Sequence, residues 1–329
     1  MELRSVGIAG LGSYVPERVL TNADLERMVD TNNEWIVSRT GISTRHIAAD
    51  DQSTSDLAYE AAKKALDDAG MEAQELDLII VATCTPDMLF PATACMLQDK
   101  LGVKGCAAFD LEAACSGFIY GLAVGAQFIA SGIYENVLVV GAETLSRVVN
   151  WQDRNTCILF GDGAGAAVLK PVEKGGFLSF HMGADGSGGE LLNVKAGGAR
   201  FPASAETIAQ GMHYMYMSGN EVFKFAVRVM GEAAVKALEK AGITKEQVDF
   251  VVPHQANIRI VDAAMRRLDL PMEKAFVNLD KYGNMSSASI PVALDELYRE
   301  NRLTKGDVLV LVGFGAGLTW GAAVVEWNR

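Results

Sequence analysis

The sequence predicts an α/β fold assembled from two related halves. Three observations lead to this expectation: strand-like and helix-like segments alternate, the strand-like runs are apolar throughout, and one stretch repeats later in the chain. Such alternation is typical of βαβ units and a mostly parallel sheet. The chain has 329 residues, half of them hydrophobic, which is ample for a large core.

We expect strands where short apolar runs end near Gly, Cys or His. Runs without polar alternation are typical of strands buried on both faces. They lie at residues 77–84, 137–143, 249–254 and 307–315. Amphipathic stretches at 54–70 and 228–242 predict helices. Each closes on a glycine, the residue that favours a helix C-terminus.

An internal repeat relates the two halves. "AAKKALDDAGMEAQELDLIIVA" from Ala61 matches "AAVKALEKAGITKEQVDFVVPH" from Ala233, 172 positions later, in helix, cap, linker and strand. Each half also ends on a Gly-Ala-Ala-Val strand. We therefore expect two units, at 1–172 and 173–329. The natural active site of such a duplicated fold is the seam between the units, near the C-terminal ends of the strands.

Charge and cysteine usage narrow the class of protein. The formal net charge of −12 argues against nucleic acid as a partner. No stretch approaches the roughly 20 apolar residues of a membrane span, and no secretory signal is evident at the N-terminus. Five cysteines without a C-x-x-C pair favour a reduced, cytoplasmic protein. They are Cys84, Cys95, Cys106, Cys115 and Cys157.

Cys115 is the strongest candidate nucleophile. It stands among small residues in "EAACSGF", between an apolar strand and a stretch that is apolar all round and predicts a central helix. The positive end of the helix dipole is expected to lower the pKa of the thiol from about 8.5. The unsatisfied backbone N–H groups of the same turn can stabilise an oxyanion. The other four cysteines are interpreted as structural.

Two polar residues are candidates to act with this thiol. Of the four histidines, His254 alone ends a buried strand just before a helix. Asn284 lies in "DKYGNMSSAS", a predicted turn ahead of a helix. An Asn that follows a Gly ordinarily serves only to form a turn. The repeat sets this segment opposite that of Cys115, so we predict that Asn284 and Cys115 occupy related places. The glycine-rich turn at 313–317 predicts close approach of backbone to a ligand.

The chain resembles one family over essentially its whole length. "AACSGF", "PHQANIRI", "YGNMSSAS" and "GFGAGLTWG", with "TNNEWIVSRTGISTRHIA" near the start, are similar to β-ketoacyl-acyl-carrier-protein synthase III of bacterial fatty-acid synthesis. The resemblance implies a thiolase-like fold with a layered αβαβα architecture, and a homodimer. It also implies a catalytic triad of Cys115, His254 and Asn284, with no metal and no cofactor beyond the coenzyme A thioester.

The implied reaction is a decarboxylative Claisen condensation that initiates fatty-acid synthesis. A short acyl-CoA, such as acetyl-CoA, would acylate Cys115, and the N–H groups of Cys115 and Ala316 would form the oxyanion hole. Malonyl-acyl-carrier protein would then lose carbon dioxide. His254 and Asn284 would donate N–H bonds to the enolate oxygen. The starter group stays open between acetyl, branched and longer acyl chains.

The resemblance also assigns binding residues. Trp35 and Arg154 would sandwich the CoA adenine, although a partly buried surface aromatic is the plainer interpretation of Trp35. The other CoA contacts would be Thr31, Arg39 and Asn257. Carrier-protein contacts would be Gln255, Arg259 and Lys224. Arg266 and Arg267 either extend this basic patch or form an ordinary solvated helix face. Phe90 corresponds to a residue lent across the dimer to the partner's acyl pocket.

The sequence excludes some alternatives to this family and leaves others open. A thiolase would need a late second cysteine, yet none follows Cys157, and the elongating condensing enzymes use two histidines, yet His254 is the last. A specialised starter-condensing enzyme keeps the same triad and stays open. Cys, His and Asn in this order also fit a thiol hydrolase, in which the Asn orients the His. A non-catalytic scaffold would require the loss of a triad member. The chain departs from some family members at Ala316 and Tyr282, where they have Gly and His.

Overall fold

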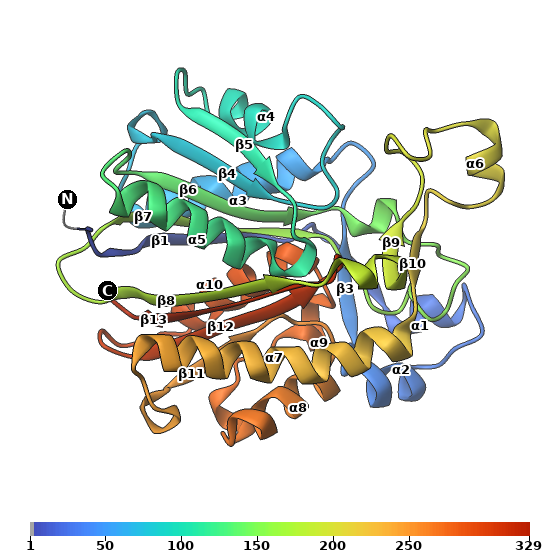
Figure 1. Cartoon of the computed structure of the whole chain (residues 1–329). Coiled ribbons are helices and arrows are strands. Elements are labelled where there is room, and N and C mark those ends of the chain that lie inside the picture. Colours follow the sequence, from blue (N-terminus) through green and yellow to red (C-terminus); the bar gives the residue numbers. More distant parts are fainter. Residues whose placement is uncertain (1–2) are drawn as a thin grey trace.

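The computed structural model describes residues 3–329, and its first sheet has five strands (Figure 1). β4 pairs in parallel with β5 and β6, whereas β7 runs antiparallel to β1 and β6. Every residue of β4 and β6 is buried, as expected for continuous apolar runs. The strand order is β1 (Val6–Tyr14), β7 (Gly163–Pro171), β6 (Val137–Glu143), β4 (Leu78–Ala82) and β5 (Ala107–Leu111).

The second sheet has four strands, all from the second half of the chain. β11 pairs in parallel with β12, and β13 runs antiparallel to both β12 and β8. In place of a fifth strand, Ala275 forms an isolated parallel bridge with Val251. The order is β11 (Phe250–Pro253), β12 (Val308–Gly315), β13 (Thr319–Glu326) and β8 (Gly176–Ala184). We propose the division at 172/173 as the boundary between the duplicated units.

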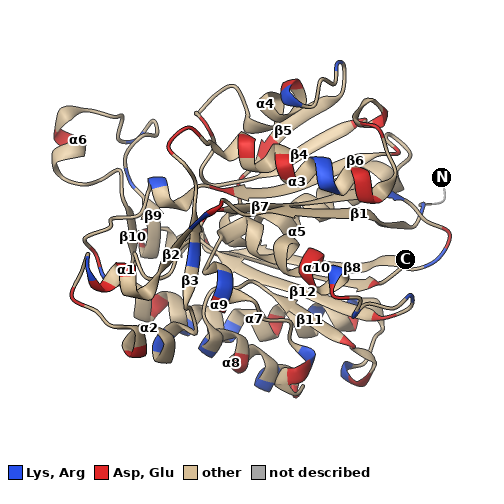
Figure 2. Cartoon of the chain, turned by 180° about the vertical axis from the view of Figure 1, so that it is seen from behind, with Lys and Arg blue, Asp and Glu red and all other residues tan. Residues whose placement is uncertain are grey.

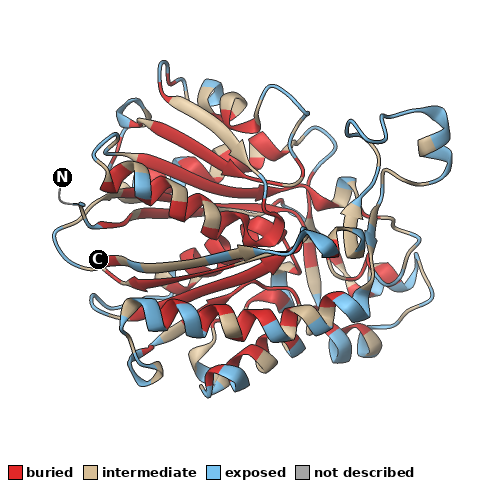
Figure 3. Ribbon diagram, viewed as in Figure 1, coloured by how far each residue is buried: buried red, intermediate tan, exposed pale blue. Residues whose placement is uncertain are grey.

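Helices form three layers around the two sheets. α5 (Gly117–Ala130) and α10 (Ser289–Arg299) lie between the sheets and share one hydrophobic core with both of them. Figure 3 shows burial concentrated in this interior, whereas the outer helices have an exposed side. The outer helices are α3 (Thr54–Ala69) and α4 (Thr93–Lys100) on the first sheet, and α7 (Gly219–Ala241) and α8 (Ile258–Leu268) on the second. The predicted αβαβα layering is confirmed.

Two excursions lie together at one end of the layered core, on the right in Figure 1. The first comprises β2 (Arg18–Thr21), α1 (Asn22–Glu26), α2 (Asn33–Thr40) and β3 (Thr44–Ile47). The second comprises β9 (Leu192–Val194), α6 (Ala205–Ala209) and β10 (Met215–Met217). Within residues 3–329, none of the helices combines the length and hydrophobicity that crossing a membrane requires.

The short helices confirm the internal repeat but contradict the predicted pairing of Cys115 with Asn284. The 3₁₀ turn η2 (Ala114–Ser116) precedes α5, and 172 positions later η7 (Ser286–Ala288) precedes α10. The structural counterpart of Cys115 is therefore Ser287, and the counterpart of Asn284 is Glu112. The prediction that Cys115 and Asn284 occupy related places is wrong, because the repeat keeps its 172-residue offset through this turn. One further short helix, α9 (Leu279–Tyr282), precedes Asn284.

Candidate functional site

Cys115 lies at the entrance of the central helix α5. It is the middle residue of η2, which follows β5 and leads directly into α5. The residue is only 8% exposed, and it lines two neighbouring cavities. The predicted sequence of strand, turn and apolar helix around this thiol is therefore confirmed.

The glycine-rich end of β12 packs directly against the backbone of Cys115. A Cβ atom at Gly315 would lie 2.5 Å from the Cys115 nitrogen and 2.9 Å from the Ala114 Cβ, so only glycine fits this approach. Thr319, just beyond the turn, donates from Oγ1 to the carbonyl oxygen of Ala113 at 2.9 Å. The second half of the chain thus holds the nucleophile's turn in place.

His254 stands at the end of β11 and is buried, with 1% of its surface exposed. Its backbone nitrogen donates to the Val312 carbonyl at 2.7 Å, which continues the pairing of β11 with β12. Its ring stands edge-on to Phe314, with the ring centroids 5.8 Å apart. Burial lowers the pKa of the imidazole to about 3, so the ring is neutral near pH 7. Its Nδ1 atom is buried without a hydrogen-bond partner among the described residues.

Asn284 is fixed by both its backbone and its side chain. Its N–H donates to the Leu159 carbonyl at 2.8 Å, and its own carbonyl accepts from Gly161 N at 3.0 Å. The side-chain Oδ1 accepts a hydrogen bond from the backbone N–H of Ser286 at 2.9 Å. Because Oδ1 is engaged in this way, the Nδ2 group is left to donate to a ligand.

The three predicted triad residues line one cavity of about 100 Å³, although they come from both halves of the chain. An adjoining cavity of about 400 Å³ also has Cys115 in its wall, together with Ala316 and Cys84. Side chains of β9 and β10, from the second excursion, close part of this larger cavity. The sequence predicts a structural role for Cys84, yet this residue lines the same cavity wall as Cys115.

The electrostatics of Cys115 differ from the sequence expectation. Burial raises the pKa of the thiol to about 12. A hydrogen bond with the Ser286 hydroxyl opposes this shift, and the nearby negative charge of Glu143 adds to it. The prediction that the helix N-terminus lowers this pKa is wrong, because removing a thiolate from water outweighs the attraction of the helix dipole.

The site rests on a buried carboxylate that the sequence reasoning missed. Glu143, at the end of β6, is fully buried and accepts hydrogen bonds from Thr85 Oγ1 at 2.6 Å and from Ser287 Oγ at 2.9 Å. It also accepts from the backbone N–H of Cys84 at 3.1 Å. Burial raises the pKa of Glu143, and these hydrogen bonds oppose that shift. The signal that was available is a charged residue closing a run that is otherwise buried on both faces.

Trp35 and the two arginines assigned to CoA form one cluster. The guanidinium carbon of Arg154 lies 4.9 Å from the centre of the Trp35 ring, and that of Arg39 lies 4.8 Å from it. Arg154 also donates to the Asp30 carbonyl at 2.9 Å. Arg154 rests directly against the indole, so an adenine that stacks between the two has to move the arginine.

Thr31 and Asn257 lie close to this cluster, but only Asn257 has hydrogen-bond partners for its side chain among the described residues. The Oγ1 atom of Thr31 is buried without a partner among the described residues. Asn257 is the N-cap of α8, where its Oδ1 accepts from the Arg259 N–H at 2.9 Å. Its Nδ2 donates to the carbonyl of Arg39 at 2.9 Å, so this amide already joins α2 to α8.

The residues assigned to a carrier protein divide into buried and exposed groups. Gln255 is fully buried: its Nε2 donates to the carbonyls of Pro253 and Phe276, and its Oε1 accepts from Asn278 N. Its prediction as a carrier contact is wrong, because the side chain stabilises loops beneath the surface. Arg259 is exposed, 5.1 Å from the Phe223 ring.

Most cations near Arg259 already have an acidic partner. Lys224 pairs with Glu221 at 2.8 Å, Arg267 with Glu232 at 3.2 Å, and Arg266 with Asp262 on its own helix. Figure 2 shows basic and acidic residues side by side on α8. This pattern is the one expected of a solvated helix face for Arg266 and Arg267.

Phe90 is among the most exposed apolar side chains of the described chain, at 83%. Its neighbour Leu89 is 76% exposed, in the segment between β4 and α4. Two consecutive exposed large apolar residues are typical of an interaction site rather than of free surface.

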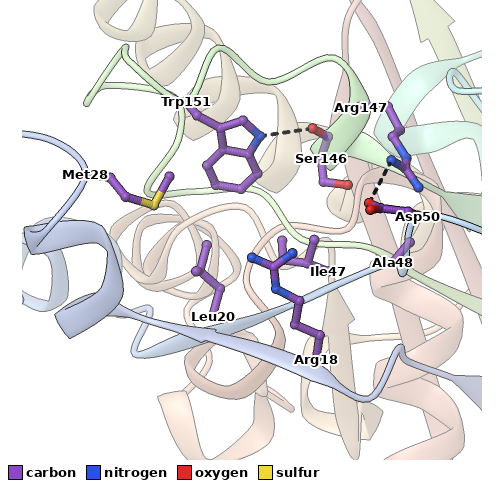
Figure 4. A pocket seen from close by; sticks show the side chains of 9 residues that line it. All are labelled: Arg18, Leu20, Met28, Ile47, Ala48, Asp50, Ser146, Arg147 and Trp151. Atoms are coloured by element: carbon purple, nitrogen blue, oxygen red, sulfur yellow. Dashed lines mark hydrogen bonds and ion pairs between the residues drawn. The ribbon is translucent and has the colours of Figure 1, made fainter.

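A separate hollow of about 260 Å³ is lined by residues of the first excursion and of the segment 146–151 (Figure 4). Trp151 forms part of its wall, where its Nε1 donates to the Ser146 carbonyl at 3.2 Å, and Arg18 and Arg147 also line it. This hollow shares no lining residue with the two cavities at Cys115. It is therefore not part of the candidate site. Across residues 3–329, no three His, Cys, Asp or Glu side chains gather as a metal-ligand set.

Comparison with known proteins identifies the family. The family model described as 3-oxoacyl-[acyl-carrier-protein (ACP)] synthase III matches residues 109–186, and the model of its C-terminal part matches residues 238–327. The chain is 64% identical over 326 residues to a β-ketoacyl-[acyl-carrier-protein] synthase III of Desulfitobacterium hafniense, covering 99% of this chain and 98% of that one. It is 56% identical to the enzyme of that name from Clostridioides difficile, covering 98% of each.

Solved structures agree with these sequence relatives. The structure of 3-oxoacyl-[acyl-carrier-protein] synthase III from Aquifex aeolicus superposes with a TM-score of 0.91 at 49% identity, covering 98% of this chain and 100% of that one. The priming β-ketosynthase of the R1128 polyketide pathway superposes with a TM-score of 0.92 at 35% identity, covering 99% and 98%. The predicted recognition is confirmed, and the chain belongs to the β-ketoacyl-acyl-carrier-protein synthase III family of acyl-transferring condensing enzymes.

Proposed function

We propose that this enzyme condenses a short acyl-CoA with malonyl-acyl-carrier protein through an acyl group held on Cys115. The observation that carries the proposal is the single cavity lined by Cys115, His254 and Asn284. It joins a nucleophile from one half of the chain to two N–H donors from the other.

In the first half-reaction, the Cys115 sulfur attacks the thioester carbon of the acyl-CoA. The thiol is protonated in the free enzyme, so its proton has to leave as the carbon–sulfur bond forms. The departing CoA sulfur takes up this proton, so the thiol proton of Cys115 ends as the thiol proton of free coenzyme A. The N–H groups of Cys115 and Ala316 stabilise the tetrahedral oxyanion.

In the second half-reaction, malonyl-acyl-carrier protein loses carbon dioxide and forms an enolate. Nδ2 of Asn284 and the N–H of neutral His254 donate to the enolate oxygen. The enolate carbon attacks the acyl-Cys115 carbonyl, the carbon–sulfur bond breaks, and the sulfur takes up a proton from water. The products are β-ketoacyl-acyl-carrier protein, carbon dioxide and free thiol.

The site favours this chemistry over thiol hydrolysis. A hydrolase of this residue order would need the Asn side chain to hydrogen-bond and orient the His ring. Here Oδ1 of Asn284 instead accepts from the Ser286 backbone, and the described contacts include no hydrogen bond between Asn284 and His254. The Asn is thus arranged as a donor to a ligand rather than as a support for the base.

The CoA nucleotide is proposed to bind at the Trp35 cluster, with Thr31, Arg39 and Asn257 as its other contacts. The unpartnered Thr31 hydroxyl supports this, because a buried hydroxyl without a partner is costly unless a ligand meets it. Arg154 would move off the indole and close on the opposite face of the adenine. The carrier protein would approach over exposed Arg259, with Lys224 at the edge of the same surface.

We also propose that the enzyme is a cytoplasmic homodimer that needs no cofactor beyond its CoA substrate. β5 lies at the sheet edge, and all five of its residues are only partly buried, which leaves it able to pair with a second copy. Exposed Phe90 would enter the partner's acyl pocket. Light scattering of the purified protein at several concentrations tests the dimer, and a constant monomer mass would contradict it.

Intact mass spectrometry tests the central proposal. Wild type and Cys115→Ala are incubated with acetyl-CoA and then with malonyl-acyl-carrier protein. One acyl group should appear on the wild type alone and should be discharged as a β-ketoacyl product. A series of branched and longer acyl-CoAs then ranks the starters. If no acyl-CoA labels the wild type, the proposal is wrong.

A further inference from the structure

The turn that carries Cys115 has a close conformational copy in the second half of the chain. Ala114 has φ of 44° and its counterpart Ser286 has φ of 45°, and both are non-glycine residues in the left-handed region. Two positions later, the backbone N–H groups of Ser116 and Ala288 donate to the carbonyl oxygens three positions before them, at 3.2 and 3.0 Å. The two copies therefore hold the same unfavourable backbone shape at the entrance of a central helix.

Each copy supports the left-handed residue with a side-chain oxygen from two positions earlier. In the second copy, Oδ1 of Asn284 accepts from the Ser286 N–H at 2.9 Å. In the first copy, Oε1 of Glu112 accepts from the Ala114 N–H, also at 2.9 Å. Such bonds favour local turns over regular structure, because they replace a backbone partner that the chain lacks there. Glu112 thus does for the nucleophile's turn what Asn284 does for its own.

We propose that Glu112 is a positioning residue for Cys115, which it serves by holding Ala114 in the left-handed conformation that aims the Cys115 N–H and thiol into the site. The inference rests on the proposed acylation of Cys115 and extends it to a residue that sequence reasoning missed. Glu112 also forms part of the wall of the larger cavity beside Cys115.

The backbone of Cys115 has little room to shift. The Cys115 nitrogen lies so close to Gly315 that a single added carbon there would come within 2.5 Å of it. A left-handed alanine is disfavoured by contact of its Cβ with the backbone, so Ala114 relaxes when its support is removed. Relaxation at Ala114 would shift the next N–H, which is one of the two proposed oxyanion donors.

The carboxylate also carries a charge that the turn does not require. The negative charge of Glu112 contributes to the raised pKa of Cys115, because it disfavours a second anion nearby. Support for the turn needs only an acceptor oxygen, which an amide also provides. Substitution by Gln therefore separates the two effects: the hydrogen bond stays and the charge goes.

The test compares Glu112→Ala, Glu112→Gln and the double variant Glu112→Ala/Ala114→Gly. Two readouts are used: the single-turnover rate of Cys115 acylation by acetyl-CoA, and the rate of its alkylation by iodoacetamide against pH. Glu60→Ala is the matched control, because it removes a glutamate from the exposed face of α3. Thermal unfolding of each variant identifies any loss of folded protein.

We expect E112A to acylate about tenfold more slowly than wild type, and E112Q to recover most of that rate. The E112Q alkylation profile should move to lower pH. Ala114→Gly should rescue the double variant even where E112A folds poorly, because glycine adopts positive φ without support. Equal rates in E112A and wild type would overturn the inference, as would equal losses in E112A and E112Q. Absence of acylation in wild type would instead overturn the proposed function on which it rests.

Discussion

Gly315→Ala is the perturbation that tests the packing of the site most directly. The added Cβ would lie 2.5 Å from the Cys115 nitrogen, 2.9 Å from the Ala114 Cβ and 3.3 Å from the Ala113 carbonyl oxygen. The first two distances are shorter than side-chain carbons tolerate, and all three atoms belong to a turn whose backbone is fixed by Thr319 and α5. The turn of Cys115 therefore has to shift.

The size of the effect has two parts. Overpacking in a well-packed region costs roughly 1–3 kcal/mol of folding free energy. Misplacing one oxyanion donor costs about 2.7–4 kcal/mol of transition-state stabilisation, or about 10²- to 10³-fold in rate. We expect the acylation rate of G315A to fall by at least about 100-fold, whereas its melting temperature falls by only a few degrees.

Rapid-quench acylation with acetyl-CoA, read by intact mass, measures the first quantity, and calorimetry measures the second. Gly186→Ala is the matched control, because a Cβ there meets no atom within 4 Å. If G315A acylates at the wild-type rate, the Cys115 N–H does not depend on this contact, and the reasoning that links the two segments is wrong.

Three further predictions concern individual side chains. Because the pKa of Cys115 is raised to about 12, its thiolate fraction grows with pH, and iodoacetamide should alkylate it about tenfold faster per pH unit between pH 7 and 10; a plateau below pH 8 would contradict this. Asn284→Asp keeps the oxygen that accepts from Ser286, loses the Nδ2 donor and adds a carboxylate at a buried position, so condensation should fall about 100-fold and the melting temperature should also fall; Asn284→Ala should lose both the acceptor and the donor. Trp35→Ala should raise KM for acyl-CoA by about 2- to 30-fold at unchanged kcat, the size of a cation–π contact, and an unchanged KM would remove Trp35 from the CoA site.

Patterns that depend on the local chain were predictable from the sequence. The structure confirms the predicted strands β4, β6, β11 and β12 and the predicted amphipathic helix α3. Each was predictable because the pattern of apolar residues along the chain indicates whether an element is buried on one face or on both. The second excursion was not predicted, since its strands β9 and β10 are short and pair only with each other.

The predictions about the site were wrong where burial and neighbouring groups, rather than the type of residue, determine what a side chain does. Gln255 is polar and follows His254, yet it is buried because three backbone groups need its amide. The thiol of Cys115 stands at a helix N-terminus, yet burial sets its pKa. Glu112 was overlooked because its importance comes from the left-handed residue beside it, and no sequence pattern reveals a φ angle.

The duplicated turns have a consequence for how such a site can arise. Two identical copies related by symmetry present every residue of the turn twice, so a nucleophile and an amide donor would each have to appear in both copies. Joining both copies in a single polypeptide releases each from the other, so that Cys115 can replace what is Ser287 in the second copy and Asn284 can stand where the first has Glu112. The asymmetry that separates attack from stabilisation is therefore a property of the covalent fusion.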